Sequence, residues 1–351
     1  MAVGPVRFHL PKGRERIMSK IKKALERSRA DRGEEQYTSD IALSEREQLE
    51  RDIRKLLMEE HPELLGGMKK QIRLQYSKTQ KIRTDPKVLF NNHVYALTPD
   101  LEITKQIEIL RTQVLKRLKD MKANSLMITS ANPGEGKTFI STNLAVSIAQ
   151  NLDRTALLVD ADLRSRRNKH RNMSDVFFNS GSKAGLADYL SNNAEIENLL
   201  VNPGIPRLTL LPSGKALPDS AAFLGSPKME ALIREMKVKY SRERILIFDC
   251  SSFLSNADPM VLSRYVDAVL LIVESAKTET KSLLRMKELL KDTKIIGTVI
   301  NKFGTANNPK CVYKDFLNFS TSRIQDILRD LGLQNFQTNI LWPRFSRRKA
   351  R

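Results

Sequence analysis

The sequence predicts an α/β fold in which helices cover both faces of a doubly wound, mostly parallel β-sheet. Six short runs are predominantly apolar: 125–130, 155–160, 207–212, 245–249, 268–273 and 295–300. Such short runs, apolar on both faces, are typical of the central strands of a parallel sheet. Helical patterns separate them, as in "GKTFISTNLAVSIAQN" and "SPKMEALIREMKVKY". The alternation of strand and helix is what predicts helices on both faces.

Three parts follow one another along the chain. The pattern of residues 1–100 predicts a charged, partly helical N-terminal extension and linker. Helical patterns occur at 18–32 and 44–65, and 80–100 is interpreted as an extended connector. A long helical pattern at 101–121 opens the folded domain, which we expect to span 101–304. Residues 305–351 are polar and end in a basic run, which indicates a tail.

The composition is strongly basic. Lys and Arg number 60 and Asp and Glu 40 in 351 residues, so the formal net charge is +20. This charge favours polyanionic partners, although a solvated basic surface without a partner explains it equally well. We expect no nucleic-acid binding, because no recognition motif accompanies the charge. The two distant cysteines, the lack of a leader pattern and the lack of a membrane-spanning run favour a cytoplasmic location.

A phosphate-binding loop lies between the first strand and the helix that follows. The stretch "ANPGEGKT" (131–138) fits the P-loop pattern with Ala131 in place of the first glycine. Its backbone N–H groups and the start of the helix favour phosphate, Lys137 reaches the β- and γ-phosphates, and the Thr138 hydroxyl ligates Mg²⁺. The predicted nucleotide-binding residues here are Asn132, Pro133, Gly134, Glu135, Gly136, Lys137, Thr138 and Phe139.

Carboxylates end two of the other predicted strands. Asp160 and Asp162 fall on the same side of an extended chain, roughly 7 Å apart along it. Two like charges this close need a cation or a proton donor between them, and Mg²⁺ supplies it if strand 155–160 lies beside the P-loop strand. The alternative is that both aspartates cap a turn and pair with the arginines that follow. Asp249 ends strand 245–249 at the expected Walker B position for Mg²⁺.

These three motifs together resemble the bacterial tyrosine kinases, which are related to the septum-positioning ATPases. The P-loop, "LLVDADLR" and "IFD" occur in the family's order, and the resemblance extends over 185–249, 265–278 and 297–304. Within the family, the chain is similar to the cytoplasmic kinases encoded with exopolysaccharide and exosortase systems. The resemblance implies an ATP-dependent protein-tyrosine autokinase with a P-loop NTPase fold and with ATP and Mg²⁺ as cofactors.

The resemblance also implies roles for single residues. Lys137 and Thr138 hold the ATP–Mg²⁺ complex, and Asp160 is the candidate base that accepts the proton of the tyrosine hydroxyl. Asp162 and Asp249 support the metal, directly or through water, so the implied metal ligands are Thr138, Asp162 and Asp249. Asn301 lies near the base of the nucleotide. Arg164 opens a cationic run at 164–172, and we expect it to stabilise phosphate charge, while the rest of the run is interpreted as a solvated loop. The predicted catalytic residues are Lys137, Asp160, Asp162 and Arg164.

Partners follow from the same resemblance. Such kinases work with a membrane chain-length or export protein that activates them, and they control the polymerisation and export of a surface polysaccharide. The implied substrate is a tyrosine-containing protein or the kinase itself. Association with the inner face of the cell membrane and homo-oligomer formation are left open.

Three features depart from the family pattern. Ser251 and Ser252 stand where prolines usually follow the Walker B strand, so we expect a looser loop and new hydrogen bonds, with weakened catalysis as the consequence. No tyrosine follows Tyr313, although the family often carries a C-terminal tyrosine cluster. The helix before the P-loop offers Lys105, Glu108 and Arg111 where many members build a ring between subunits, and only Arg111 agrees.

Two other functions therefore remain in competition. One is a positioning-type ATPase whose acceptor is water, against which Asn132 argues because those ATPases carry an extra lysine there. The other is a non-catalytic, nucleotide-binding scaffold of the polysaccharide export machinery, which the altered Walker B loop and the missing tyrosine cluster keep open.

Overall fold

The computed structural model describes residues 79–99, 101–164, 173–178, 183–192, 194–239, 243–275, 277–290, 292–302 and 339–340. All of them belong to Gln71–Arg351, one of two units into which the chain divides. The helices predicted at 18–32 and 44–65 lie outside the described residues, as does the cationic run after Arg164.

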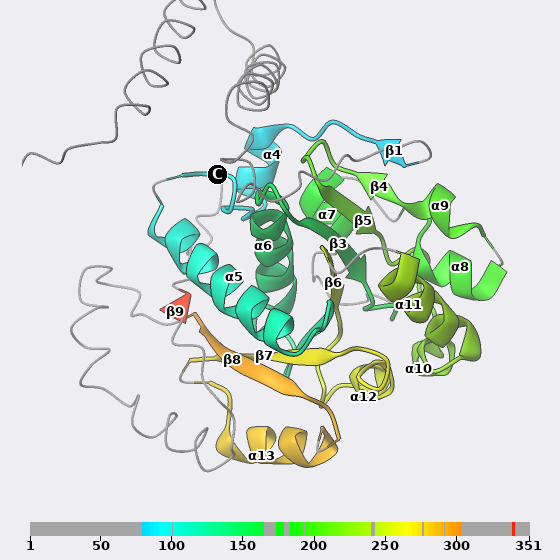
Figure 1. Cartoon of the computed structure of the whole chain (residues 1–351). Helices are drawn as coiled ribbons and strands as arrows, with labels where there is room; N and C mark the ends of the chain where they lie inside the picture. The colour runs from blue at the N-terminus through cyan, green and yellow to red at the C-terminus, as the bar shows by residue number, and fades with distance from the viewer. Residues whose placement is uncertain are drawn as a thin grey trace, which may run out of the picture. The chain divides into compact units, whose positions relative to one another are not determined.

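A mostly parallel sheet forms the centre of the described fold, which confirms the predicted fold class. The strand order is β1-β4-β5-β3-β6-β2-β7-β8-β9, and only the β4–β5 pair is antiparallel (Figure 1). The six predicted strands are all present, as β2 (Ser125–Ser130), β3 (Thr155–Asp160), β5 (Leu208–Leu211), β6 (Arg244–Asp249), β7 (Ala268–Glu274) and β8 (Ile295–Asn301). The sequence did not predict the two-residue strands β1 (Gln80–Lys81), β4 (Val201–Asn202) and β9 (Asn339–Ile340), which are too short to show a period.

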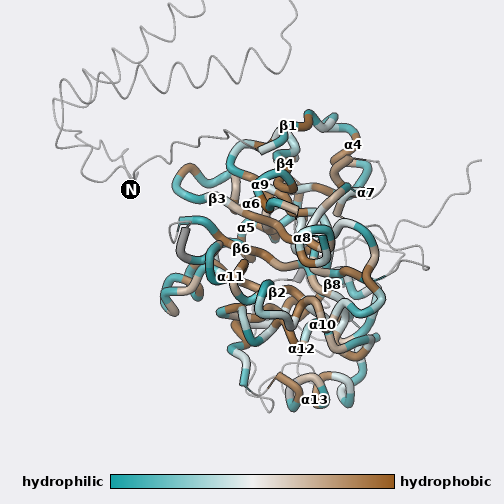
Figure 2. The backbone as a smooth tube through the Cα atoms, turned by 90° about the vertical axis from the view of Figure 1, so that its right-hand side faces the viewer, coloured by the Kyte–Doolittle hydropathy of each residue, from teal (hydrophilic) through white to brown (hydrophobic). Residues whose placement is uncertain are grey.

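Helices cover both faces of this sheet. One face carries α4 (Pro86–Asn91), α5 (Glu102–Asp120), α6 (Lys137–Ala149) and α7 (Met173–Phe178). The other carries α8 (Leu186–Asn192), α9 (Ile196–Leu199), α10 (Ser220–Leu224), α11 (Pro227–Lys239), α12 (Asp258–Leu262) and α13 (Thr280–Leu289). Because successive strand residues alternate between faces, Leu126 and Ile128 join one apolar cluster and Met127 joins the other. In Figure 2 the central strands are largely brown, which marks them as hydrophobic.

The helix that follows the P-loop is buried almost all round. Every residue of α6 from Phe139 to Ala149 is buried, because the helix lies between the sheet and α5. The α5 helix in turn buries one face, on which Ile103, Ile107 and Leu110 recur at helical spacing. The start of α6 is therefore held firmly at the edge of the sheet where the P-loop lies.

The segment before α5 is part of the fold. The prediction of an extended connector at 80–100 is wrong for α4, whose N-cap Asp85 accepts a hydrogen bond from the Lys87 amide at 2.8 Å. Asp85 is the N-cap and Pro86 the first residue of this helix. The same Asp-Pro pair also occurs in loops, so the sequence alone favours an extended segment here. Val94 and Ala96 are also buried in the core, so the folded unit begins before residue 101. It also extends past 304, since β9 pairs with β8 in the stretch that we expected to be a tail (Figure 1).

The condition that strand 155–160 lies beside the P-loop strand is not met. β6 lies between β2 and β3, with Ile128 of β2 opposite Asp249 and Asp249 opposite Asp160 of β3. The sequence order of the strands does not fix their spatial order in a doubly wound sheet. This order places the carboxylates of Asp160 and Asp249 on directly neighbouring strands, as a shared cation site would need.

Candidate functional site

The predicted site residues gather at one edge of the sheet. The strands β2, β3, β6, β7 and β8 are mutually parallel, and they end there at Ser130, Asp160, Asp249, Glu274 and Asn301. Ligands of open α/β sheets bind outside these carboxyl ends. The P-loop leaves the same edge, so Lys137 and Thr138 lie beside the acidic strand ends.

Two glycines give the P-loop its shape. Gly134 has φ +81° and Gly136 has φ +105°, a backbone region that other residues rarely adopt. A Cβ at Gly136 would lie 2.0 Å from Asn301 Nδ2, whereas nothing lies within 4 Å of one at Gly134. The loop therefore packs tightly against the end of β8 at Gly136 and borders open space at Gly134, where a phosphate has room.

Lys137 is the cation of this loop. Its Nζ donates to Ser130 Oγ at 3.1 Å, and that hydroxyl donates to the Asn132 carbonyl at 2.8 Å. Phe139 has a buried ring that packs edge-on against Tyr95, with centroids 6.2 Å apart, so only its backbone can face a nucleotide. The predicted roles of both residues toward ATP stay predictions.

Two buried carboxylates stand next to the loop. Asp160 is 1% exposed and Asp249 is 3% exposed, and their Cα atoms are register partners in the β3–β6 pair. Asp249 Oδ1 has no hydrogen-bond partner in the described structure. Asp162 is half-buried, and its amide donates to Asp160 Oδ1 at 3.3 Å. Three acidic side chains thus meet where the P-loop cation lies.

The protonation of Asp249 reflects this crowding. Burial and then the charge of Asp160 raise its pKa to about 7, while the Thr138 hydroxyl and Lys137 act in the opposite direction. A buried acidic pair with an unpartnered oxygen fits a divalent cation. The cation would compensate for the lost hydration of the carboxylates and offset the repulsion between them. The described residues include no group of three or more His, Cys, Asp or Glu that could hold a metal alone. This agrees with Mg²⁺ bound through one or two carboxylates plus a hydroxyl and substrate phosphates.

Arg164 lies two residues beyond this acidic cluster. Its side chain is exposed, but its Nε donates to Ser220 Oγ at 3.3 Å. The arginine is thus attached to α10, which belongs to the helical layer on the opposite face of the sheet from α6. The alternative in which Asp160 and Asp162 merely cap a turn does not explain why Asp160 is buried against Asp249.

Residues that the sequence did not single out hold the P-loop in place. Glu135 accepts from the Asn132 amide at 3.2 Å and from Thr278 Oγ1 at 2.6 Å. Lys302 donates to the Gly134 carbonyl at 2.6 Å and to Glu274 Oε2 at 3.1 Å. Glu274, Thr278 and Lys302 come from the ends of β7 and β8, more than a hundred residues away. No local pattern marks them.

Asn301 supports the same loop. It is fully buried, and its Nδ2 donates to the Glu135 carbonyl at 2.9 Å while its Oδ1 has no partner in the described structure. Its position behind Gly136 makes it a packing partner of the P-loop. The role toward the nucleotide base stays a prediction.

The altered loop after the Walker B strand is well hydrogen-bonded. Ser251 Oγ donates to Asn256 Oδ1 at 2.8 Å, and the hydroxyls of Ser252 and Ser255 lie 2.5 Å apart. Thr129 Oγ1 also donates to the Ser251 carbonyl at 2.8 Å. Of the two expectations for this loop, the new hydrogen bonds are confirmed, and they hold the loop without prolines.

The residues compared with the intersubunit ring lie on α5. Lys105 and Glu108 are exposed, whereas Arg111 Nη1 donates to the carbonyl and the hydroxyl of Ser147 on α6, at 3.2 Å each. The one residue that agrees with the ring pattern is therefore engaged within its own chain.

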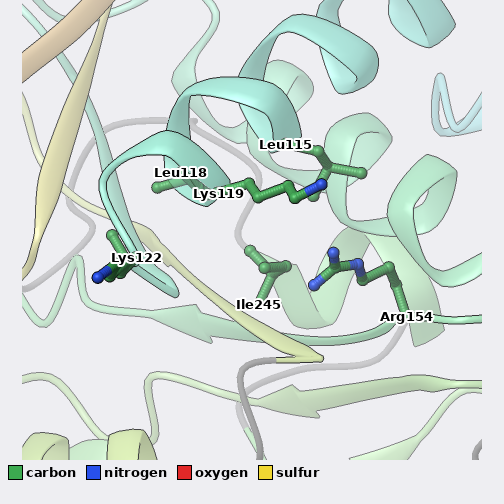
Figure 3. Close-up of a pocket in the computed structure, with 7 residues that line it drawn as sticks. Leu115, Leu118, Lys119, Lys122, Arg154 and Ile245 are labelled. Atoms are coloured by element: carbon green, nitrogen blue, oxygen red, sulfur yellow. The ribbon is translucent and has the colours of Figure 1, made fainter.

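A small pocket of about 120 Å³ lies at the opposite, amino-terminal edge of the sheet. Lys119 and Arg154 reach over its apolar floor, which includes Leu118 and Ile245 (Figure 3). The lysine stands in the last turn of α5, where cations complement the helix dipole, so the pocket needs no ligand to explain its charge. Among the helices of the described residues, none is both long and apolar enough to cross a bilayer.

Comparison with known proteins identifies the family. The family described as "CobQ/CobB/MinD/ParA nucleotide binding domain" matches residues 126–320, which is more than half of the chain. The chain is 30% identical over 212 residues to the tyrosine-protein kinase CpsD of Streptococcus agalactiae, covering 60% of this chain and 86% of CpsD. It is 32% identical over 212 residues to the tyrosine-protein kinase YwqD of Bacillus subtilis (strain 168), covering 60% and 85%.

The chain belongs to the bacterial tyrosine-protein kinases. A solved structure agrees with this membership: the kinase domain of the Escherichia coli tyrosine kinase Etk superposes with a TM-score of 0.54. It is 26% identical and covers 70% of this chain and 89% of that domain. The recognition made from the P-loop, "LLVDADLR" and "IFD" is thus confirmed, and so is the nucleotide-binding P-loop fold.

Proposed function

We propose that this tyrosine kinase transfers the γ-phosphoryl group of ATP to a tyrosine hydroxyl, with Mg²⁺ as cofactor. The observation that carries the proposal is the convergence of Lys137 with the buried Asp160 and Asp249 at one sheet edge. Phosphoryl transfer needs positioning and charge neutralisation rather than covalent catalysis by the protein. A loop shaped for phosphate beside a buried acidic pair provides both.

Each residue has a role in this scheme. The P-loop amides and Lys137 bind the phosphates, and Thr138, Asp249 and Asp162 hold the metal. When bound, Mg²⁺ would neutralise the charge of the phosphates. Asp160 accepts the proton of the attacking tyrosine hydroxyl, for which its place beside the metal ligands is suited. The hydrogen-bonded Ser251–Ser255 loop supports a fixed Walker B end and hence turnover rather than a scaffold role.

Burial excludes one tyrosine of the fold as the acceptor. Tyr95 is 6% exposed, and its hydroxyl lies 2.7 Å from His93 Nδ1, so it is not accessible to an active site. We infer that the acceptor is a different tyrosine, of another protein or of the kinase itself. We also propose that the kinase regulates the biosynthesis, polymerisation and export of an exopolysaccharide from the cytoplasmic side, with a membrane chain-length or export protein as activator.

The test is to incubate the purified full chain with ATP and Mg²⁺ and to detect phosphotyrosine by intact mass and by antibody. Lys137→Met and Asp160→Asn are run beside the wild type, and we expect both to lose the signal. Phosphate release without phosphotyrosine would instead indicate a positioning-type ATPase. ATP binding with neither product, also in the presence of a partner's cytoplasmic tail, would indicate a scaffold.

A further inference from the structure

A buried hydroxyl–carboxylate pair lies beside the catalytic edge. Ser220 and Asp258 are both fully buried, and Ser220 Oγ lies 2.8 Å from each carboxylate oxygen of Asp258. They stand at the starts of the short helices α10 and α12, which lie side by side in both views (Figures 1 and 2). Burying a carboxylate here costs free energy, which the single hydroxyl offsets only in part.

The pair continues to Arg164. A serine hydroxyl has one proton, which Ser220 donates to Asp258, and its oxygen accepts from Arg164 Nε at 3.3 Å. The result is a directed chain of hydrogen bonds from an exposed guanidinium to a buried carboxylate. It fixes Arg164 through Nε, while its two terminal nitrogens bond to none of the described residues and can bind a ligand.

This chain is attached to the acidic cluster of the active site. The Leu217 amide donates to the Leu163 carbonyl at 2.8 Å, so the segment before α10 is bonded to the residue between Asp162 and Arg164. Charge links the groups as well: burial raises the pKa of Asp258, Arg164 lowers it and Asp162 raises it again. Arg164 and Asp258 thus share their surroundings with a predicted ligand of Mg²⁺.

We propose that Ser220 and Asp258 are positioning residues that hold Arg164 so that its terminal N–H groups bind the phosphoryl group during transfer. This deepens the kinase function proposed above and rests on it. An arginine fork matches phosphoryl oxygens in two contacts, but a long free side chain would lose rotamer entropy on binding. Fixing Nε beforehand removes much of that loss. The buried carboxylate also balances the positive charge of Arg164 while the site is empty.

A purely structural role is the competing explanation, since the pair also joins α10 to α12. The two explanations differ in one respect. If the pair acts through Arg164, its removal matters only while Arg164 is present. If the pair merely joins the helices, its removal lowers the free energy of unfolding whether or not Arg164 is there. The loss of activity is then no larger than the loss of folded protein.

The test compares Ser220→Ala, Ser220→Thr, Arg164→Ala and the Ser220→Ala/Arg164→Ala double variant in the full chain. A synthetic Glu–Tyr copolymer serves as acceptor at saturating ATP. We expect Arg164→Ala to lower kcat about a hundredfold and Ser220→Ala about tenfold, with the KM for ATP unchanged. The double variant should be no worse than Arg164→Ala, and Ser220→Thr should restore turnover because it keeps the hydroxyl.

A binding readout separates this proposal from the kinase function itself. The Mg²⁺–ADP–aluminium fluoride complex mimics the phosphoryl group in transfer, and its affinity does not depend on any acceptor. Arg164→Ala and Ser220→Ala should weaken it while leaving the affinity for Mg²⁺–ADP unchanged, even if the wild type makes no phosphotyrosine. Ser263→Ala on α12 is the matched control, because its buried hydroxyl donates only to the Met260 carbonyl at 2.9 Å. Multiplying effects in the double variant, or an unchanged fluoride complex in Ser220→Ala, would overturn the proposal.

Discussion

The two edges of the central sheet carry charge in opposite ways. At the carboxyl-terminal edge Asp160 and Asp249 are buried side by side, and Asp249 keeps an oxygen without a partner in the described structure. At the amino-terminal edge Asp267 accepts from the Asn124 and Ser125 amides at 3.1 and 3.0 Å and pairs with Lys237. At the first edge the two carboxylates repel each other until a cation or a proton neutralises them, whereas at the second edge the charge of Asp267 is already paired. Incomplete satisfaction of buried charge therefore marks the functional edge.

The largest contrast should come from removing one lysine at each edge. Lys137→Met should lower phosphotyrosine formation by about two to three orders of magnitude, because a cation that stabilises developing charge is lost. Lys119→Met is the matched control at the opposite edge, where the side chain is exposed on the last turn of α5. We expect the kcat of this control to stay within about twofold of the wild-type value. Equal losses in both variants, measured as kcat, would remove the distinction between the edges.

Gly136→Ala should disturb the functional edge without touching a charge. The added Cβ would meet Asn301 Nδ2 at 2.0 Å, in a backbone conformation with φ +105° that disfavours alanine. We expect a loss of about 1–3 kcal/mol from backbone strain, and more where Asn301 is displaced. Gly134→Ala is the control, because it shares the positive φ but meets nothing within 4 Å. The midpoint of thermal unfolding should therefore be lower for Gly136→Ala than for Gly134→Ala, and equal midpoints would contradict the close packing at Gly136.

Asp267→Asn should weaken the amino-terminal edge and leave catalysis alone. Burial opposes ionisation of Asp267, but the Lys237 ammonium and the hydrogen bonds from Ser125 and Asn124 outweigh it, so its pKa is lowered. A lowered folded-state pKa stabilises the fold above the unfolded value near 4 and loses that effect as the pH falls through the folded value. We expect the variant to lose about 1–3 kcal/mol at pH 7, with a smaller difference at acidic pH, in urea unfolding. A difference from wild type that grows on acidification would contradict this sign.

The smallest effect concerns the supports behind the P-loop. Thr278→Val keeps the shape but removes the bond to Glu135 and the one that the Glu274 amide donates to Thr278 Oγ1 at 2.9 Å. We expect the KM for ATP to rise about twofold to fivefold, since one supported turn of the loop is loosened. Thr112→Val on α5 is the control, because its hydroxyl bonds to the Glu108 carbonyl at an exposed site. A KM unchanged by Thr278→Val would show that the other contacts suffice.

Much of the active site could be predicted because its signals are local. The spacing of Gly134, Gly136 and Lys137 after an apolar run specifies a loop that binds phosphate. Asp160 and Asp249 end apolar runs, and the carboxyl ends of parallel strands meet at one edge. Runs that are apolar on both faces indicate buried strands, and apolar residues at helical spacing indicate an amphipathic helix, so all six of these strands and α5 were also predictable.

The order of the strands and the partners of the loops could not be predicted. Nothing near Asp249 indicates that β6 separates β2 from β3, and nothing near Glu135 indicates that Thr278 donates to it. The two-residue strands were also missed, because their pairing depends on a neighbour rather than on a pattern.

By itself, then, the sequence determined the P-loop, the carboxylates at the strand ends that we propose for metal and proton, and the layers that present them. Only the tertiary structure decided which side chains support that chemistry. Asn301 and Lys302 hold the P-loop, and Ser220 with Asp258 holds Arg164. The physical reason is that hydrogen bonds and burial depend on distance in space. Residues far apart in the chain acquire their partners only when the sheet brings its strand ends together.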